Sequence, residues 1–255
     1  MIEFLEDESR LLDFLSQFMV FMGLLSFALL RFINMPYGRY TSTAFGPAIP
    51  VRLAWFIQEL PSLAVPLYYL ASQPPLTTPS QLLMGFFICH YFQRTLIFPF
   101  LIRGGKPTPL LSFALAFIFC CYNGYLQSSY LVKYSAFPSD WTHDPRFIAG
   151  SVLFFSGMFI NIYSDHILRN LRKPGESGYK IPYGGLFEYV TGANFFGEIV
   201  EWSGFAVASW SLPGAAFAIF TLLVLSSRAQ QHHQWYVEKF DNYPKSRKIL
   251  VPFVY

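Results

Sequence analysis

The stretch AWFIQELPS, residues 54–62, places Gln58 and Glu59 side by side inside an otherwise apolar run. Across the 255 residues, 53% are hydrophobic and only 13% are charged, and Phe occurs 29 times. Soluble domains carry about a quarter charged residues. One soluble core cannot bury this much apolar surface, so the composition predicts a polytopic membrane protein. A carboxyl group inside a membrane is costly and usually functional, which makes Glu59 the first residue to explain.

Apolar windows of about 20 residues are long enough to cross a bilayer. The chain contains seven such windows, and they predict an all-α fold of seven transmembrane helices in a single membrane-embedded domain, residues 1–255. The sequence SLPG, residues 211–214, separates the last two windows by a tight turn. The predicted spans are 11–30, 51–70, 81–102, 110–131, 147–169, 195–210 and 213–231.

Lysine and arginine predict the orientation of these spans, because basic residues concentrate on the cytosolic side. Of the 18 basic residues, 14 lie in or beside loops 31–50, 103–109 and 170–194 and the C-terminal tail. The opposite side holds three, and Arg94 falls within a span. This bias predicts an outside or lumenal N-terminus and a cytosolic C-terminus. The membrane is the endoplasmic reticulum in a eukaryote or the inner membrane in a bacterium.

Polar side chains within the spans fall at similar depths. Glu59 lies eight residues past Val51, roughly 12 Å from the cytosolic end of its helix. Tyr91 lies about 16 Å from the same side, counted from Ile102. Polar residues also recur at helical spacing near the cytosolic ends of later spans: Asn161, Asp165 and Arg169; Asn194, Glu198 and Glu201; His232 and Tyr236.

Their convergence predicts a cavity with two parts. The cytosolic mouth is polar and basic, which suits a phosphate-bearing cofactor. The deeper floor is apolar and aromatic, with Glu59 and Tyr91 as polar groups, which suits a hydrophobic substrate that enters from lipid. The sequence contains no G-x-G-x-x-G and no P-loop motif, so helices and loops must hold any dinucleotide.

Other partners and sites receive little support. A formal charge of +3 does not indicate nucleic acid as a partner, and no obligatory protein partner is evident. Cys89, Cys120 and Cys121 lie in apolar runs without metal-ligand spacing. His232 and His233 are adjacent, but no carboxylate or cysteine completes a ligand set, so no metal site is predicted.

Five blocks of this sequence resemble the steroid 5α-reductase family (3-oxo-5α-steroid 4-dehydrogenases), and most of all its type 1 branch. They run in order from about residue 36 to the C-terminus, whereas the first 35 residues show no match. The blocks are AWFIQELPS, HYFQRT, NIYSDHILRNLRKPG, YKIPYGGLFEYVTGANFFGEIVEW and YPKSRKILVPF.

The resemblance implies NADPH-dependent reduction of the 4,5 double bond of 3-keto-4-ene steroids such as testosterone or progesterone. It places the substrate pocket mainly in the N-terminal half and the NADPH site mainly in the C-terminal half. Trp55, Gln58, Glu59 and Tyr91 match substrate-contacting residues of the family, and the last three match its catalytic residues. Residues that match its NADPH-binding positions are Asn161, Asp165, Arg172, Tyr179, Asn194, Glu198, His232, Tyr236 and Arg247.

This chemistry explains an acid in the membrane. Hydride addition at C5 of the enone moves negative charge onto the C3 oxygen, where hydrogen-bond donors must already be in place. Tyr91 donates through its phenol. Glu59 donates only when protonated, and apolar surroundings favour its neutral form. A tyrosine and a protonated acid hold a steroid enolate in the same way in ketosteroid isomerase. Gln58 faces about 100° away on the helix, and its shared role at C3 follows from the resemblance.

Three other functions remain open at this point. One is that of a related membrane sterol reductase. Another is that of an isoprenylcysteine-type methyltransferase, which uses S-adenosylmethionine. The third is a receptor or proton-coupled carrier, in which Glu59, Asp165 and Glu198 relay protons.

Overall fold

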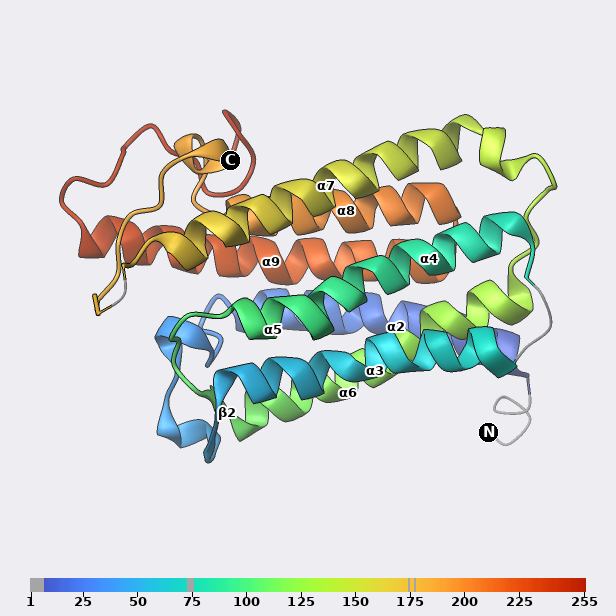
Figure 1. The fold of residues 1–255 in the computed structure, drawn as a ribbon, viewed down its shortest axis with the longest axis horizontal. Helices are drawn as coiled ribbons and strands as arrows, with labels where there is room; N and C mark the ends of the chain where they lie inside the picture. The colour runs from blue at the N-terminus through green and yellow to red at the C-terminus, as the bar shows by residue number, and fades with distance from the viewer. Residues whose placement is uncertain (1–6, 73–75, 174, 177) are drawn as a thin grey trace.

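The computed structural model describes residues 7–72, 76–173, 175–176 and 178–255. Long helices run roughly along one axis, and their connecting loops gather at the two ends (Figure 1). Six of the seven predicted ranges each coincide with one long helix, whereas the third, 81–102, covers a helix, a π-helical turn and a second, short helix. The long helices are α2 (Glu8–Leu29), α3 (Val51–Ser72), α4 (Thr78–Phe92), α6 (Leu110–Ser129), α7 (Pro145–Asn170), α8 (Ala193–Ser209) and α9 (Leu212–Lys239).

Four of these segments are long and apolar enough to cross a membrane: α2, α6 with its extension to Tyr134, α7 and α9. By contrast, α4 and α8 have only 15 and 17 residues. Large apolar side chains cover much of the outer surface; Phe155 and Phe159 on α7 are 49% and 69% exposed. The chain is therefore a helical protein with membrane-spanning segments. The count of seven spans and their orientation stay predictions.

The third predicted span is not one regular helix. After α4 the chain makes a π-helical turn, Gln93–Ile97, and continues as α5 (Phe98–Leu101). A π-turn inserts an extra residue, re-aims the side chains around it, and is frequent at functional sites. Here it buries Arg94 and Thr95 inside the bundle. A second π-turn, Tyr130–Tyr134, extends α6.

Glycines bring α7 and α8 into direct backbone contact. A Cβ placed on Gly157 would lie 2.5 Å from the carbonyl oxygen of Gly197, and one on Gly197 would lie 2.5 Å from the amide nitrogen of Asn161. The same relation recurs one heptad away between Gly150 and Gly204, at 2.6 Å in each direction. Small residues allow this close approach between membrane helices. The contact fixes the polar residues of α7 against those of α8.

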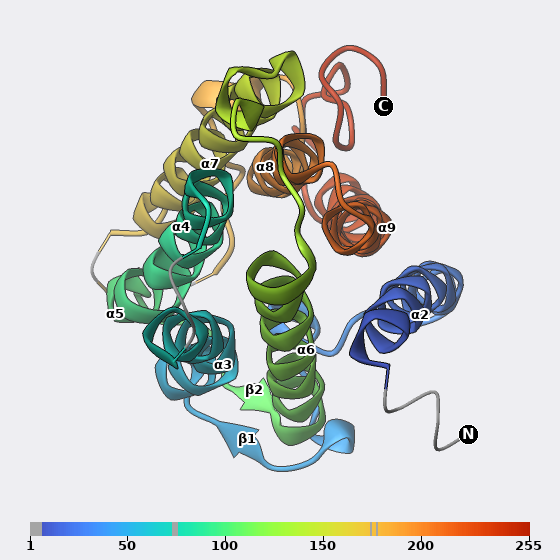
Figure 2. The ribbon, with the colours of Figure 1, turned by 90° about the vertical axis from the view of Figure 1, so that its right-hand side faces the viewer.

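The remaining helices close the bundle around an aromatic core. Viewed from one end, α6 packs against α3, α8 lies between α7 and α9, and α2 lies along α9 (Figure 2). Aromatic side chains from α4, α7, α8 and α9 fill the space between these four helices. The most deeply buried of them are Phe87, Phe154, Trp202, Phe205 and Phe217.

Short elements organise one end of the bundle. Strand β1 (Ala48–Ile49) pairs antiparallel with β2 (Thr108–Pro109), with Ala48 opposite Pro109. The C-terminal tail lies along the segment before α8, where Thr191 N donates to the Lys248 carbonyl at 2.9 Å. The loops that carry most of the basic residues meet at this end (Figure 1). Short 3₁₀ turns complete the loops at Gly38–Tyr40, Thr43–Phe45, Trp141–His143 and Gly185–Glu188.

Candidate active site

One cavity opens between α3, α4, α6, α8 and α9, and its volume is about 140 Å³. One side is polar and the other is apolar and aromatic. The polar side consists of Glu59, His90, Tyr91, Arg94 and Glu198, and the apolar side of Ala116, Phe119, Cys120, Phe217, Phe220, Thr221, Val224 and Leu225.

Glu59 and Tyr91 therefore line the same space, as the sequence predicts. Glu59 accepts two hydrogen bonds: Gln58 Nε2 donates to Oε1 at 3.4 Å, and Cys120 Sγ donates to Oε2 at 3.7 Å. Gln58 is buried but does not line the cavity. Gln58 therefore reaches the site only through its hydrogen bond to the Glu59 carboxyl.

Tyr91 is held from α6. Its phenol oxygen accepts from Asn123 Nδ2 at 3.3 Å, so this hydrogen bond does not use the phenol proton. Asn123 is oriented in turn by Gln127, whose Nε2 donates to Asn123 Oδ1 at 3.2 Å and to the Pro213 carbonyl at 2.9 Å. All three side chains are buried. A hydrogen-bonded chain thus fixes Tyr91 from a helix that the sequence analysis does not connect with it.

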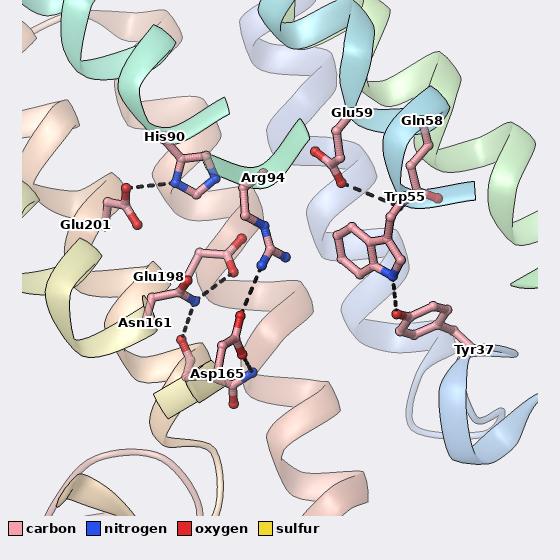
Figure 3. Close-up of polar contacts among 11 residues, drawn as sticks. Tyr37, Trp55, Gln58, Glu59, His90, Arg94, Asn161, Asp165, Glu198 and Glu201 are labelled. Carbon is pink, nitrogen blue, oxygen red and sulfur yellow. Dashed lines mark hydrogen bonds and ion pairs between the residues drawn. The ribbon is translucent and has the colours of Figure 1, made fainter. Parts of the chain in front are cut away.

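A polar network adjoins the cavity through Arg94 and Glu198 (Figure 3). Arg94 Nη1 pairs with Asp165 Oδ2 at 3.2 Å, and Asn194 Nδ2 donates to Asp165 Oδ1 at 3.2 Å. Asn161 Nδ2 donates to the Asn194 carbonyl at 3.0 Å and to Glu198 Oε2 at 3.4 Å. Four of the six polar residues that the sequence predicts on α7 and α8 therefore meet, with Arg94 as their cation. The other two lie elsewhere: Arg169 contacts His166, and Glu201 pairs with His90.

Trp55 connects this network to the loop before α3. Its indole Nε1 donates to the Tyr37 hydroxyl at 2.6 Å, and the Arg94 guanidinium lies over its ring, 4.7 Å from the centroid. Burial raises the pKa of Tyr37. Its hydroxyl therefore stays protonated and can donate further. Arg228 of α9 also lies over the Tyr37 ring, 5.6 Å from the centroid.

At the basic end, Arg247 is buried at 3% exposure yet incompletely bonded. Its Nη1 donates to the Pro182 carbonyl at 3.1 Å, whereas Nε and Nη2 have no hydrogen-bond partner in the part of the chain that the structure describes. Its guanidinium lies over Tyr183 and Tyr243, 5.2 and 5.1 Å from their centroids. A buried arginine with free donors fits an anionic group such as a phosphate.

Arg39 forms a similar feature nearby. Its Nη2 donates to the Tyr236 hydroxyl at 3.3 Å, and its buried Nη1 has no hydrogen-bond partner among the described residues. The guanidinium lies over three rings, with centroids at 4.2 Å for Trp235, 4.6 Å for Tyr236 and 5.2 Å for Tyr179. Tyr236 stacks on Tyr243, which continues to Arg247. These residues fit a nucleotide with its phosphates at this end of the bundle.

Two predicted cofactor residues lie apart from these contacts. Arg172 is exposed in the loop after α7, near Gly104. His232 packs between Phe195 and Tyr40, with ring centroids 5.4 and 6.1 Å away. It is half-buried and lies on the same helix as Tyr236, one turn away.

Sequence reasoning did not assign four residues that the structure places at this site: His90, Arg94, Cys120 and Arg39. Arg94 had a signal, since a lone arginine within a predicted span indicates function. His90 precedes Arg94 by four residues in the quoted block HYFQRT, so helical spacing predicts both on one face of the third predicted span. Cys120 and Arg39 had no such signal, because they reach the site only through the packing of α6 and of loop 31–50.

The architecture and the cavity define a helical membrane protein with a buried polar site beside an apolar pocket. Comparison with known sequences identifies the family. A sequence model described as 3-oxo-5-alpha-steroid 4-dehydrogenase matches residues 106–255. The chain belongs to this family of oxidoreductases of steroid metabolism.

Individual relatives match almost the whole chain. It is 57% identical over 252 residues to 3-oxo-5-alpha-steroid 4-dehydrogenase 1 of Bos taurus, covering 97% of this chain and 98% of the relative. It is 55% identical over 251 residues to the Homo sapiens type 1 enzyme, covering 97% of both. Identity to the human type 2 enzyme is 50% over 234 residues, 89% of this chain and 92% of the relative. The predicted resemblance to the family and its type 1 branch is confirmed. The matches also cover most of the first 35 residues, so the prediction that this segment shows no match is wrong.

Proposed function

We propose that the protein reduces the 4,5 double bond of 3-keto-4-ene steroids with NADPH and releases 5α-reduced 3-ketosteroids. The observation that carries this proposal is the placement of Glu59 and Tyr91 on one cavity whose other wall is apolar. Two potential donors then face a pocket that accepts a rigid hydrophobic guest from the bilayer. Family membership supports the same reaction and favours a reductase over a methyltransferase or a carrier.

In this mechanism, Tyr91 and Glu59 hold the C3 oxygen. Asn123 occupies the Tyr91 oxygen from behind, so the phenol proton is directed to the substrate. Gln58 and Cys120 fix the Glu59 carboxyl from two sides, so it meets the ketone in one orientation. Donors that are ordered before reaction stabilise the developing oxyanion at no reorganisation cost. The apolar wall excludes water, which strengthens both hydrogen bonds.

The cofactor supplies a hydride when it is bound. Arg39 and Arg247 would hold its phosphates, because both carry buried guanidinium nitrogens without a partner. Tyr179 and Tyr236 would provide flat surfaces beside Arg39. The network of Asn161, Asp165, Asn194 and Glu198 adjoins the cavity and would face the polar end of the nicotinamide.

We further propose seven membrane spans with the basic end in the cytosol. NADPH then enters from the cytosol and the steroid from the membrane. The compartment follows the cell: endoplasmic reticulum in a eukaryote or inner membrane in a bacterium.

The test measures NADPH oxidation and steroid product together. Purified protein in lipid nanodiscs is given testosterone, progesterone or a simple cyclic enone. Tyr91→Phe should lower turnover by about 100- to 1,000-fold, as expected for the loss of one oxyanion donor, and should still bind NADPH. Glu59→Ala should lose nearly all turnover, whereas Glu59→Gln keeps a donor and retains more.

Tyr125→Phe is the matched control. Tyr125 also donates a phenol hydrogen bond, but to Glu8 at the other end of the bundle, at 3.0 Å. Loss of the Tyr125 hydroxyl should leave turnover near that of the wild type. Wild-type protein that binds NADPH but reduces none of the three enones would refute the proposed function. Normal turnover by Tyr91→Phe would refute only its place in the mechanism.

A further inference from the structure

His90 and Glu201 form a buried pair that the mechanism above leaves unused. Nδ1 of His90 lies 2.7 Å from Oε1 of Glu201, and the contact joins α4 to α8. The two side chains are 5% and 0% exposed. Ionisable groups inside a membrane bundle are rare and usually functional.

The pair is oriented toward the cavity. His90 lines it, and its second ring nitrogen points away from Glu201 toward the side of Arg94 (Figure 3). The imidazole plane is fixed by the rings of Trp202 and Tyr91, with centroids 4.6 and 5.0 Å away. A carboxylate that holds one imidazole nitrogen while the other faces a reaction site is the geometry of a general acid or base.

Glu201 also sets the protonation of the pair. Its Oε2 is buried and lacks a hydrogen-bond partner among the described residues. A net negative charge on the pair is therefore disfavoured, because no donor solvates that oxygen. The pair can be neutral in two ways, as imidazolium with carboxylate or as imidazole with carboxylic acid. In both forms Nε2 of His90 carries a proton, since Nδ1 and Oε1 share the other.

The proposed reduction requires a proton at C4 of the steroid. Tyr91 and Glu59 are assigned to the C3 oxygen, so another group must supply this proton. We propose that His90, positioned by Glu201, is the acid that protonates C4 of the steroid; this rests on the proposed function. Hydride addition at C5 leaves an electron pair shared between C4 and the C3 oxygen. The Nε2–H bond breaks and leaves its electrons on nitrogen, the C4–H bond forms, and C3 returns to a ketone. The pair then carries one negative charge, which a proton from water removes.

Several charged or titratable groups face His90 and shape its pH dependence. Tyr91 and Arg94 come from its own helical segment, Glu198 and Glu201 from α8, Glu59 from α3 and Cys120 from α6. An acid donates only in its protonated form, so protonation at C4 should slow as pH rises.

The reverse step gives a test that needs no hydride transfer. The acid that protonates C4 is also the base that removes a C4 proton from the saturated 3-ketosteroid. Wild-type protein in D₂O should therefore exchange one of the two C4 hydrogens of 5α-dihydrotestosterone faster than protein-free nanodiscs do. Mass spectrometry and NMR of the recovered steroid measure the rate and the position.

His90→Gln should slow this exchange by about 100-fold or more, the usual contribution of a general acid or base, and should still bind the steroid. Glu201→Gln should slow it less and flatten its pH profile. Glu8→Gln is the control, because it removes a carboxylate from another multiply bonded ion pair, with Lys133 at 2.9 Å. Exchange should be unchanged in that variant.

The outcomes separate the two proposals. If His90→Gln folds, binds steroid and exchanges C4 at the wild-type rate, His90 is not the acid, and reduction by the wild type still supports the proposed function. If His90→Gln does not fold, the Glu201→Gln variant provides the test. An exchange rate at C4 with the wild-type pH profile in that variant overturns the inference. Failure of the wild type to reduce any enone refutes the proposed function itself.

Discussion

Nη1 of Arg94 lies 3.2 Å from Oδ2 of Asp165, so one ion pair joins the π-helical turn after α4 to α7. Both side chains are about nine-tenths buried, at 11% and 10% exposure. Asn194 of α8 donates to the other oxygen of Asp165. Three helical segments therefore meet at this pair, at the boundary between the cavity and the polar network.

Replacing one partner of this pair should destabilise the fold more than replacing both partners. Arg94→Gln leaves Asp165 as an uncompensated buried charge, and we expect a loss of about 3–5 kcal/mol. The double variant with Asp165→Asn should recover part of that loss. Thermal unfolding in nanodiscs measures all three proteins. Strictly additive effects of the two substitutions would contradict the coupling.

An exposed pair supplies the comparison. Lys180 and Glu176 are in contact in the loop after α7, with side chains 43% and 37% exposed. Surface ion pairs contribute little because water screens them. Lys180→Gln should therefore leave the unfolding temperature unchanged.

The close contact of α7 and α8 predicts intolerance to one methyl group. Gly157→Ala would place a Cβ 2.5 Å from the Gly197 carbonyl oxygen, and backbone cannot move aside as a side chain can. Overpacking typically costs about 1–3 kcal/mol, and here it also separates Asn161 from Asn194. We expect lower stability together with weaker NADPH binding. Gly85→Ala is the matched control, because nothing lies within 4 Å of its Cβ and alanine favours helix by about 1 kcal/mol.

The sequence located helices well because each apolar window is both long and bounded by Pro, Gly or charge. It also brought Glu59 and Tyr91 to one depth, since rise per residue fixes depth along a helix. It could not show the π-turn at Gln93–Ile97, because that turn depends on tertiary contacts of Arg94. The positions of Arg39 and Cys120 were equally hidden, since they depend on how a loop and α6 pack against the rest.

The start of α7 should weaken in acid. Asp144 caps this helix, with Oδ1 accepting from Arg146 N at 2.8 Å, and the Arg146 guanidinium pairs with Oδ2 at 2.8 Å. The Arg146 contacts lower the pKa of Asp144 to about 2. Because this value is below that of the unfolded chain, near 4, the unfolded state binds more protons between the two. The stabilisation is therefore complete above pH 4 and is lost as pH falls to about 2.

Asp144→Asn isolates this contribution. Asparagine keeps the cap but removes the charge. Unfolding temperatures of wild type and variant should differ most above pH 4 and converge as pH falls to 2. A constant difference across that window would show that Asp144 does not titrate as described.

Arg247 should matter for NADPH through its shape as well as its charge. Its Nε and Nη2 are buried without partners, so they can bind two phosphate oxygens as a fork. Arg247→Lys keeps the charge but loses the fork, and we expect NADPH affinity to fall about 10- to 100-fold, the range for hydrogen bonds to charged groups. Titration calorimetry measures the affinity directly. Lys248→Gln removes the adjacent, exposed charge and should change the affinity little at physiological salt. Equal losses in the two variants would mean that general positive charge, rather than the Arg247 fork, attracts the cofactor.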